Sequence, residues 1–223
     1  MSNPCSSLLE LLGLIVGTGA WFCSLAATLM PSWQSLSTEL LSAESYEVGL
    51  WETCVVQEGG ATECREYDSL LGLSHDIMLA RILMCLSDAL SLLGIIIAIP
   101  GLKQVKSCQW EEGWRVKRGM KITAGVLCLI AGIVGLVPVS FMAHDIVKKF
   151  FDHSLPEVVP RFEFGDAMFV GWAAGFLHVV AAILFFASCS GLGYAEPRLV
   201  FHQRQNEYLT SSGPSSKERT EYV

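Results

Sequence analysis

Four long apolar segments dominate the hydrophobic pattern of this chain. They cover about residues 8–30, 77–102, 122–141 and 168–190. Each reaches the ~20 apolar residues that a helix needs to cross a bilayer, and in lipid a helix satisfies its own backbone hydrogen bonds. The pattern therefore predicts four transmembrane helices in one membrane domain, residues 1–193, followed by a polar tail.

Basic residues predict the orientation of this bundle. Between the second and third apolar segments lie Lys103, Lys106, Arg115, Lys117, Arg118 and Lys121. Between the first and second there are only Arg65 and Arg81. Positive charge favours the cytoplasmic side, so both termini are expected inside the cell and the segments 31–76 and 142–167 outside it. Lys148, Lys149 and Arg161 in the second outer segment weaken this comparison without reversing it.

Two cysteines stand out in the first outer segment. Cys54 and Cys64 flank Gly59-Gly60, a dipeptide typical of a hairpin turn, so they are expected to face each other across two antiparallel strands. Outside the cell such a pair is expected to form a disulfide; two free thiols are the alternative. Alternating segments elsewhere in both outer segments complete a predicted small antiparallel β-sheet on an all-α membrane bundle.

Two other cysteines lie near the predicted cytoplasmic ends of the spans. Cys108 and Cys189 are candidates for reversible palmitoylation, which favours juxtamembrane cysteines. The alternative is that each is a small apolar residue that fills space.

The composition gives no sign of catalysis or of nucleic-acid binding. The net charge of −7 is opposite to that of a nucleic-acid-binding surface. The five histidines are scattered, and no cysteine pair has zinc-finger spacing. We expect no metal, no cofactor, no small-molecule substrate and no enzymatic activity.

The outer segments resemble those of the claudin family. The matching residues are Trp33, Gly49-Leu50-Trp51, Cys54, Cys64 and Arg81, with Phe150-Phe151-Asp152, Phe162-Glu163-Phe164-Gly165, Gly171-Trp172 and the terminal Tyr222-Val223. The first set alone is shared with peripheral myelin protein, the epithelial membrane proteins and some auxiliary subunits; the later matches favour claudins. The resemblance implies a left-handed four-helix bundle with a five-stranded sheet, four strands from the first outer segment and one from the second.

It also implies a function. Claudins polymerise side by side in one membrane and meet partners on the opposing cell, where their strands seal the paracellular space or conduct ions through it. The partners implied are the chain itself and other claudins, in cis and in trans, within the lipid of the plasma membrane at the tight junction. A regulatory subunit beside a receptor or channel in the same membrane is the alternative. The match does not identify the individual claudin.

Charge in the first outer segment bears on ion selectivity. Its acids are Glu39, Glu44, Glu47, Glu52, Glu58, Glu63, Glu66, Asp68 and Asp76. Exposed charges more than ~8 Å from an ion count for little at physiological salt, so the nearest charge should decide. By resemblance, Arg65 occupies a charge-selecting position that is basic in barrier or anion-favouring members. Glu66 matches a position that is acidic in some cation-conducting members, and an ion pair between Arg65 and Glu63 would weaken both effects. We interpret the chain as a cation-restricting barrier.

Three apolar residues match claudin assembly positions. Leu70 corresponds to the residue that enters a neighbour's pocket, and Phe150 and Phe151 correspond to the pocket itself; packing within the monomer is the alternative. Arg81 matches an arginine that braces the outer segment against the bundle, which indicates a structural role.

The tail, 194–223, is polar and of low complexity, and is expected to be disordered. Its end, Thr220-Glu221-Tyr222-Val223, has the form that PDZ domains capture by strand addition, with the free carboxylate in a backbone nest. With the family resemblance, this predicts scaffolds of the zonula occludens type as partners.

One acid inside a predicted span has no counterpart in the resemblance. Asp88 lies deep in the second span, at a depth similar to that of His178 in the fourth. An intramembrane acid is a candidate functional residue, but a structural polar contact is also common. The sequence leaves open a pair with His178, a protonated carboxyl, or a bond to Ser87, Ser91 or Thr123.

Overall fold

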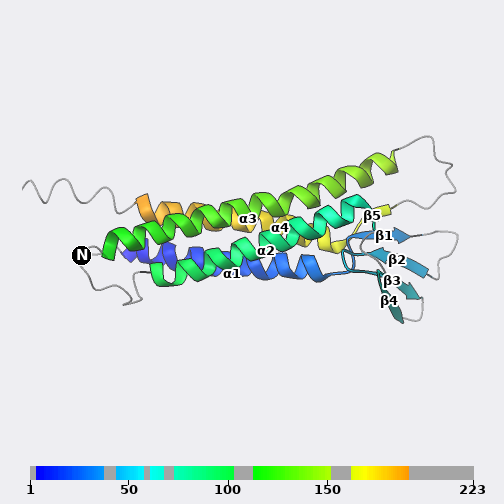
Figure 1. Cartoon of the computed structure of the whole chain (residues 1–223), viewed down its shortest axis with the longest axis horizontal. Helices are drawn as coiled ribbons and strands as arrows, with labels where there is room; N and C mark the ends of the chain where they lie inside the picture. Colours follow the sequence, from blue (N-terminus) through cyan, green and yellow to red (C-terminus); the bar gives the residue numbers. More distant parts are fainter. Residues whose placement is uncertain are drawn as a thin grey trace, which may run out of the picture.

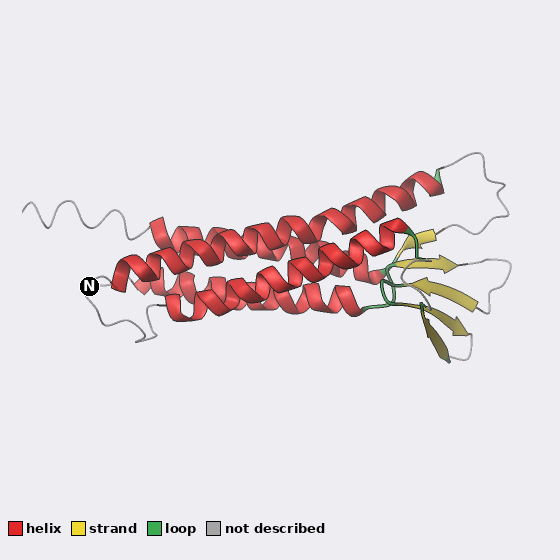
Figure 2. Cartoon of the chain, viewed as in Figure 1, coloured by secondary structure: helices red, strands yellow, loops and turns green. Residues whose placement is uncertain are grey.

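The computed structural model describes residues 4–37, 44–57, 61–67, 73–102, 113–151 and 162–190. Their elements are α1 (Pro4–Leu29), β1 (Gln34–Ser37), β2 (Glu44–Val48), β3 (Glu52–Gln57), β4 (Thr62–Glu66), α2 (His75–Gly101), α3 (Gly113–Phe150), β5 (Phe162–Phe164) and α4 (Asp166–Ser190). The helices form an elongated bundle with all five strands at one end (Figure 1; Figure 2). We call this the sheet end; the orientation predicted above places it outside the cell.

All four helices are long and apolar enough to cross a membrane. α1 packs chiefly on α4 and α2 chiefly on α3, and α3 also packs extensively on α4. α1 and α2 meet over a much smaller surface. Glycines permit close approach between the helices: a Cβ at Gly132 would lie 3.0 Å from the Gly175 carbonyl oxygen of α4. Such small-residue contacts are typical of membrane bundles, where close packing replaces the hydrophobic effect.

Helix α3 differs most from the prediction. It has 38 residues, which corresponds to about 57 Å. The segment 142–150, which the sequence analysis assigned to the second outer loop, is in fact the last part of this helix, and its first turns lie before residue 122. Hydropathy detects only the lipid-compatible part of a helix, so the polar residues at both ends of α3 concealed its full length. α3 therefore projects beyond the other helices at the sheet end (Figure 1).

The sheet has the strand order β4-β3-β2-β1-β5, and its neighbouring strands are antiparallel. Four strands come from the first outer segment and one from the second, as the family resemblance implies. Cys54 lies directly opposite Cys64 in the β3–β4 register, and the two form a disulfide. The expected fold class and disulfide are both confirmed.

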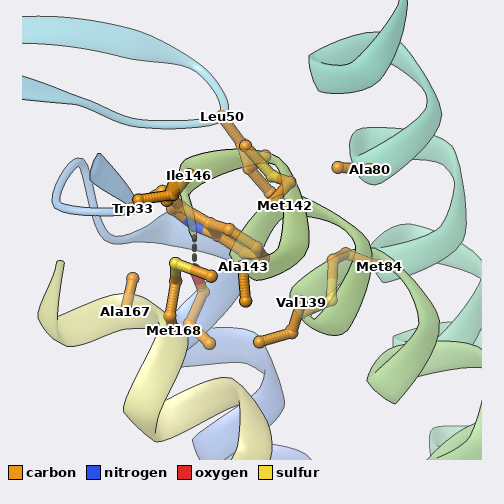
Figure 3. Close-up of a cluster of buried hydrophobic side chains, with 11 residues drawn as sticks. Trp33, Leu50, Ala80, Met84, Val139, Met142, Ala143, Ile146, Ala167 and Met168 are labelled. Atoms are coloured by element: carbon orange, nitrogen blue, oxygen red, sulfur yellow. Dashed lines mark hydrogen bonds between the residues drawn. The ribbon is translucent and has the colours of Figure 1, made fainter. Parts of the chain in front are cut away.

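A buried apolar cluster joins the sheet to the bundle (Figure 3). Trp33 and Leu50 are fully buried there, and the Trp33 Nε1–H donates to the Ala27 carbonyl oxygen at 2.8 Å. Helix side chains complete the cluster: Ala80, Met84, Val139, Met142, Ala143, Ile146, Ala167 and Met168. The backbone approaches closely beside it: at Gly165 a side chain would clash with the Ser32 carbonyl oxygen. The sheet is therefore fixed to the helices by packing as well as by its connections.

Candidate functional site

Arg81 braces the first outer segment against α2. Its side chain is 8% exposed, and its Nε–H donates to the Leu50 carbonyl oxygen. The guanidinium carbon lies 4.9 Å from the centre of the Trp51 ring and 5.2 Å from that of Tyr67. Cation–π attraction to two rings and a charge-assisted hydrogen bond offset the cost of burying the charge. This geometry accords with the structural role expected for Arg81.

The Gly49-Leu50-Trp51 turn is tied to α1 and to β3. The Trp51 Nε1–H donates to the Thr28 carbonyl oxygen at 2.9 Å, in the last turn of α1. The Tyr67 hydroxyl donates to the Gly49 carbonyl oxygen at 3.1 Å and accepts from the Thr53 hydroxyl at 3.1 Å. Trp33, the turn and Arg81 thus form one structural unit that fixes where the sheet stands.

Arg65 and Glu66 lie on opposite faces of the sheet. They are successive residues of β4, and successive side chains of a strand point to opposite faces. Arg65 is opposite Thr53 and Glu66 is opposite Glu52 in the β3–β4 register. Both are exposed. Arg65 and Glu66, which favour opposite ion selectivities, therefore face different surroundings. The β3–β4 pairing is needed to see which residues lie next to each of them.

The two faces also differ in charge. Glu63 and Arg65 share one face, where they line a shallow hollow with Thr53, Val55 and Cys64. On the other face Glu66 and Glu52 are directly opposed, and the register places Glu47 and Glu163 on that same face. Arg65 is the only basic residue in the five strands. One face is therefore mixed in charge, and the other is acidic.

Phe150 and Phe151 lie at an apolar groove beside the sheet. The groove has a volume of about 390 Å³ and is lined by Ile146, Val147, Phe150, Phe151, Phe162, Glu163, Phe164 and Phe169. Phe151 is 66% exposed, and its ring meets that of Phe150 edge to face at 5.4 Å. The sequence predicts a loop for both phenylalanines, whereas Phe150 is the last residue of α3 and Phe151 follows it directly. Large exposed aromatics around a groove are typical of a protein–protein contact.

Two walls of this groove were not predicted from the sequence. Phe162 and Phe164 project from β5 on the same side, and Phe169 follows in the first turns of α4. Phe164 and Phe169 pack edge to face, and both meet Trp172. The alternation of Phe162-Glu163-Phe164 was the available signal, since one face of that strand had to be apolar.

Several predicted residues lie outside the described part of the chain: Leu70, Cys108, Thr220, Glu221, Tyr222 and Val223. Cys189, in contrast, lies within the described part of the chain, near the end of α4. Its thiol is free, and the residue is 5% exposed. Its burial favours the space-filling alternative over palmitoylation.

One ion pair inside the bundle was not predicted from the sequence. Glu10 of α1 and Lys121 of α3 form a buried ion pair, with 2.6 Å between carboxylate oxygen and ammonium nitrogen. The sequence analysis counted Lys121 only as a predicted cytoplasmic loop charge. A charge in a span is tolerated when a partner faces it inside the bundle.

Asp88 makes a structural polar contact, but with partners other than those that the sequence left open. Its carboxyl is bonded to Ser24 and Thr28 of α1, at 2.6 Å and 3.0 Å. Ser87 instead donates to the Ala131 carbonyl oxygen, and Ser91 reaches only the Asp88 backbone. His178 is buried, and neither ring nitrogen has a hydrogen-bond partner among the described residues.

One cluster has the spacing of metal ligands. Donor atoms of Glu52, Cys54 and Cys64 lie within 4.8 Å of one another. The two sulfurs are joined in the disulfide, so they offer no thiolate to a metal ion. A single carboxylate remains, which does not make a metal site.

Comparison with known proteins identifies the family. The model of the PMP-22/EMP/MP20/Claudin family matches residues 7–185. Rat claudin-3 is 33% identical over 217 residues, which is 96% of this chain and 95% of that protein. Mouse claudin-9 is 35% identical over 222 residues, 98% and 99% of the two chains, and mouse claudin-1 is 33% identical over 195 residues, 85% and 91%.

The chain belongs to the claudin family. The match includes all nine helices and strands described above, apart from the outermost turns of α1 and α4. The relatives are different claudins at similar identity, so the family is shown and the individual member is not distinguished. The exposed features described for this claudin include the groove at Phe150 and Phe151 and the two faces of the sheet.

Proposed function

We propose that this claudin is a structural component of tight-junction strands in the plasma membrane. It polymerises in cis, meets claudins of the opposing cell in trans, and limits ion passage between cells; it has no catalytic role. In this arrangement the sheet lies outside the cell and both termini lie in the cytoplasm. The observation that carries the proposal is the exposed phenylalanine groove, because a monomer gains nothing from leaving such a surface uncovered.

Cis assembly follows if the groove receives an apolar side chain from a neighbour. We assign that role to Leu70, which lies between β4 and α2 in the sequence. Phe150 and Phe151 form one rim of the groove, and the two phenylalanines of β5 form the other. Each copy then both donates a leucine and receives one, and such a head-to-tail contact generates open chains.

We further propose that Arg65 makes the strand restrict cations. An ion path along the mixed face passes Arg65 and Glu63, and their charges oppose each other at close range. An ion path along the other face passes only acids and favours cations. We place Arg65 on the ion path, so ions pass along the mixed face. The fixed positive charge of Arg65 then repels cations.

Replacing Arg65 by glutamate should increase cation permeability relative to anion permeability several-fold. The substitution reverses the only basic charge of the sheet and leaves Glu63 unopposed on that face. The measurement is the dilution potential across an epithelial monolayer that expresses the full chain. It also tests the general proposal, because the wild-type chain should raise transepithelial resistance over untransfected cells.

Glu66→Lys is the matched control. It makes an equally large charge change on the adjacent residue of β4, on the opposite face. We expect its effect on permeability to be much smaller than that of Arg65→Glu. If Glu66→Lys has the larger effect, the acidic face lines the path and the chain is a cation-conducting member.

Removal of Tyr222-Val223 should abolish binding to an isolated PDZ domain of a zonula occludens scaffold. The pocket of such a domain takes an apolar terminal side chain beside the free carboxylate, and the truncated tail ends in the charged Glu221 instead, so the apolar determinant is lost. Titration of a tail peptide with the domain measures the affinity, with Lys217→Ala as a control outside the last four residues. Unchanged affinity of the truncated peptide would contradict this assignment.

A further inference from the structure

Asp88 lies at the midpoint of α2, where its half-buried carboxyl faces α1. The Ser24 hydroxyl lies 2.6 Å from Oδ1, and the Thr28 hydroxyl lies 3.0 Å from Oδ2. Ser24 and Thr28 are 2% and 3% exposed, so these contacts are shielded from water. We call these three side chains the Asp88 network.

The hydrogen atoms of the network can be counted. The Thr28 hydroxyl also lies 2.9 Å from the Ser24 carbonyl oxygen, one helical turn earlier in α1. A hydroxyl carries one hydrogen, and neither a carbonyl nor an ionised carboxylate can donate. If Asp88 is ionised, Thr28 faces two acceptors with a single hydrogen, and one short contact lacks a proton.

A proton on Oδ2 of Asp88 removes this conflict. The acid then donates from Oδ2 to the Thr28 oxygen, and Thr28 donates to the Ser24 carbonyl oxygen. Ser24 donates through its own hydroxyl to Oδ1. Each contact then has one hydrogen, and each hydroxyl or acid hydrogen of the network is used once.

We infer that Asp88 is held as a neutral carboxylic acid that joins α1 to α2 and positions the sheet end of the bundle. The location supports this inference, because an uncharged acid avoids most of the cost of a charge in the middle of a spanning helix. Asp88 is a positioning residue: it acts through Thr28 and Ser24 and touches no ion.

The same contacts connect the network to the sheet. α1 and α2 share little packing surface, so their few polar bonds carry a large part of their alignment. The Thr28 carbonyl oxygen accepts the Trp51 indole N–H, and the Trp51 ring packs under Arg81. Arg81 and Asp88 lie two turns apart on the same face of α2. α2 therefore makes two fixed contacts: Asp88 binds the end of α1, and Arg81 binds the base of the sheet.

The first test compares Asp88→Asn with Asp88→Leu in the full chain, purified in detergent. Asparagine has the shape of the protonated acid: its amide N–H donates to Thr28 and its oxygen accepts from Ser24. We expect Asp88→Asn to melt within about 1 °C of the wild type. Asp88→Leu loses both interhelical bonds and should melt about 2–6 °C lower. Ser24→Ala should reproduce part of that loss.

The second test uses dicyclohexylcarbodiimide, an apolar reagent that modifies protonated carboxyl groups in lipid. The acid proton passes to one carbodiimide nitrogen and the carboxyl oxygen bonds to the central carbon, which gives an O-acylisourea with no other reactant. Mass spectrometry of the membrane-embedded chain at neutral pH should find this adduct on the peptide that contains Asp88. The adduct should be absent in Asp88→Asn.

The outcomes are distinct. If Asp88→Asn melts as low as Asp88→Leu, or if Asp88 stays unlabelled in the folded wild-type chain, the carboxyl is ionised and the inference is wrong. If Asp88→Leu melts like the wild type, the network does not position the helices. Neither readout requires junction strands, so failure here leaves the proposed function untouched, and failure of strand assembly leaves this inference untouched.

Discussion

Replacing Phe151 by glutamate is expected to abolish continuous tight-junction strands while the protein still reaches the cell surface. Phe151 is 66% exposed at the rim of the groove, so the substitution costs the isolated monomer little. In an assembled strand the carboxylate would be buried against apolar rings without a partner. Interface residues of this kind contribute about 2 kcal/mol or more, roughly a 30-fold loss of affinity at every contact along the polymer.

Freeze-fracture imaging of cells that express the variant measures the strands, and surface biotinylation measures delivery. Phe151→Leu is the matched control: it keeps the groove apolar and should retain strands. Leu70→Glu, on the proposed donor side, should give the same loss as Phe151→Glu. Normal strands in both glutamate variants would show that this claudin assembles through another surface.

Replacing Trp33 by alanine is expected to lower the free energy of unfolding by about 3–5 kcal/mol. Trp33 is fully buried at the centre of the cluster that joins sheet and helices, so its removal leaves a cavity. It also leaves the Ala27 carbonyl oxygen without its donor. For a chain of this size the melting temperature should fall by roughly 10 °C or more.

Thermal unfolding of the purified full chain provides the measurement. Trp33→Phe separates the two contributions, since it keeps most of the apolar volume and removes the N–H donor; we expect about 1 kcal/mol for the hydrogen bond. A phenylalanine variant as unstable as the alanine variant would mean that the hydrogen bond, and not the packing, holds the sheet on the bundle.

The sequence predicted the spans and the β3–β4 pairing because both depend on local information. A bilayer sets the length of an apolar segment, and the Gly59-Gly60 dipeptide in the sequence predicts which residues of the two flanking strands are opposed. The sequence therefore predicted the Cys54–Cys64 disulfide, whereas the five-stranded sheet was implied by the family resemblance.

The contacts in the interior of the bundle could not be predicted from the sequence in the same way. Hydropathy identifies a helix and its length in lipid, but it does not give the rotation of one helix against another. Asp88 therefore had several candidate partners at a similar depth, and the bundle selected Ser24 and Thr28. The separation of Arg65 and Glu66 onto two faces followed from strand geometry, yet its meaning depended on which residues of β3 stood opposite.

The Glu10–Lys121 ion pair has a consequence for biosynthesis. Its two residues lie 111 positions apart in the chain. At the usual pace of translation, on the order of ten seconds separate their emergence from the ribosome. During that interval Glu10 has no Lys121 to pair with, so this buried ion pair can form only after the third span has been synthesised.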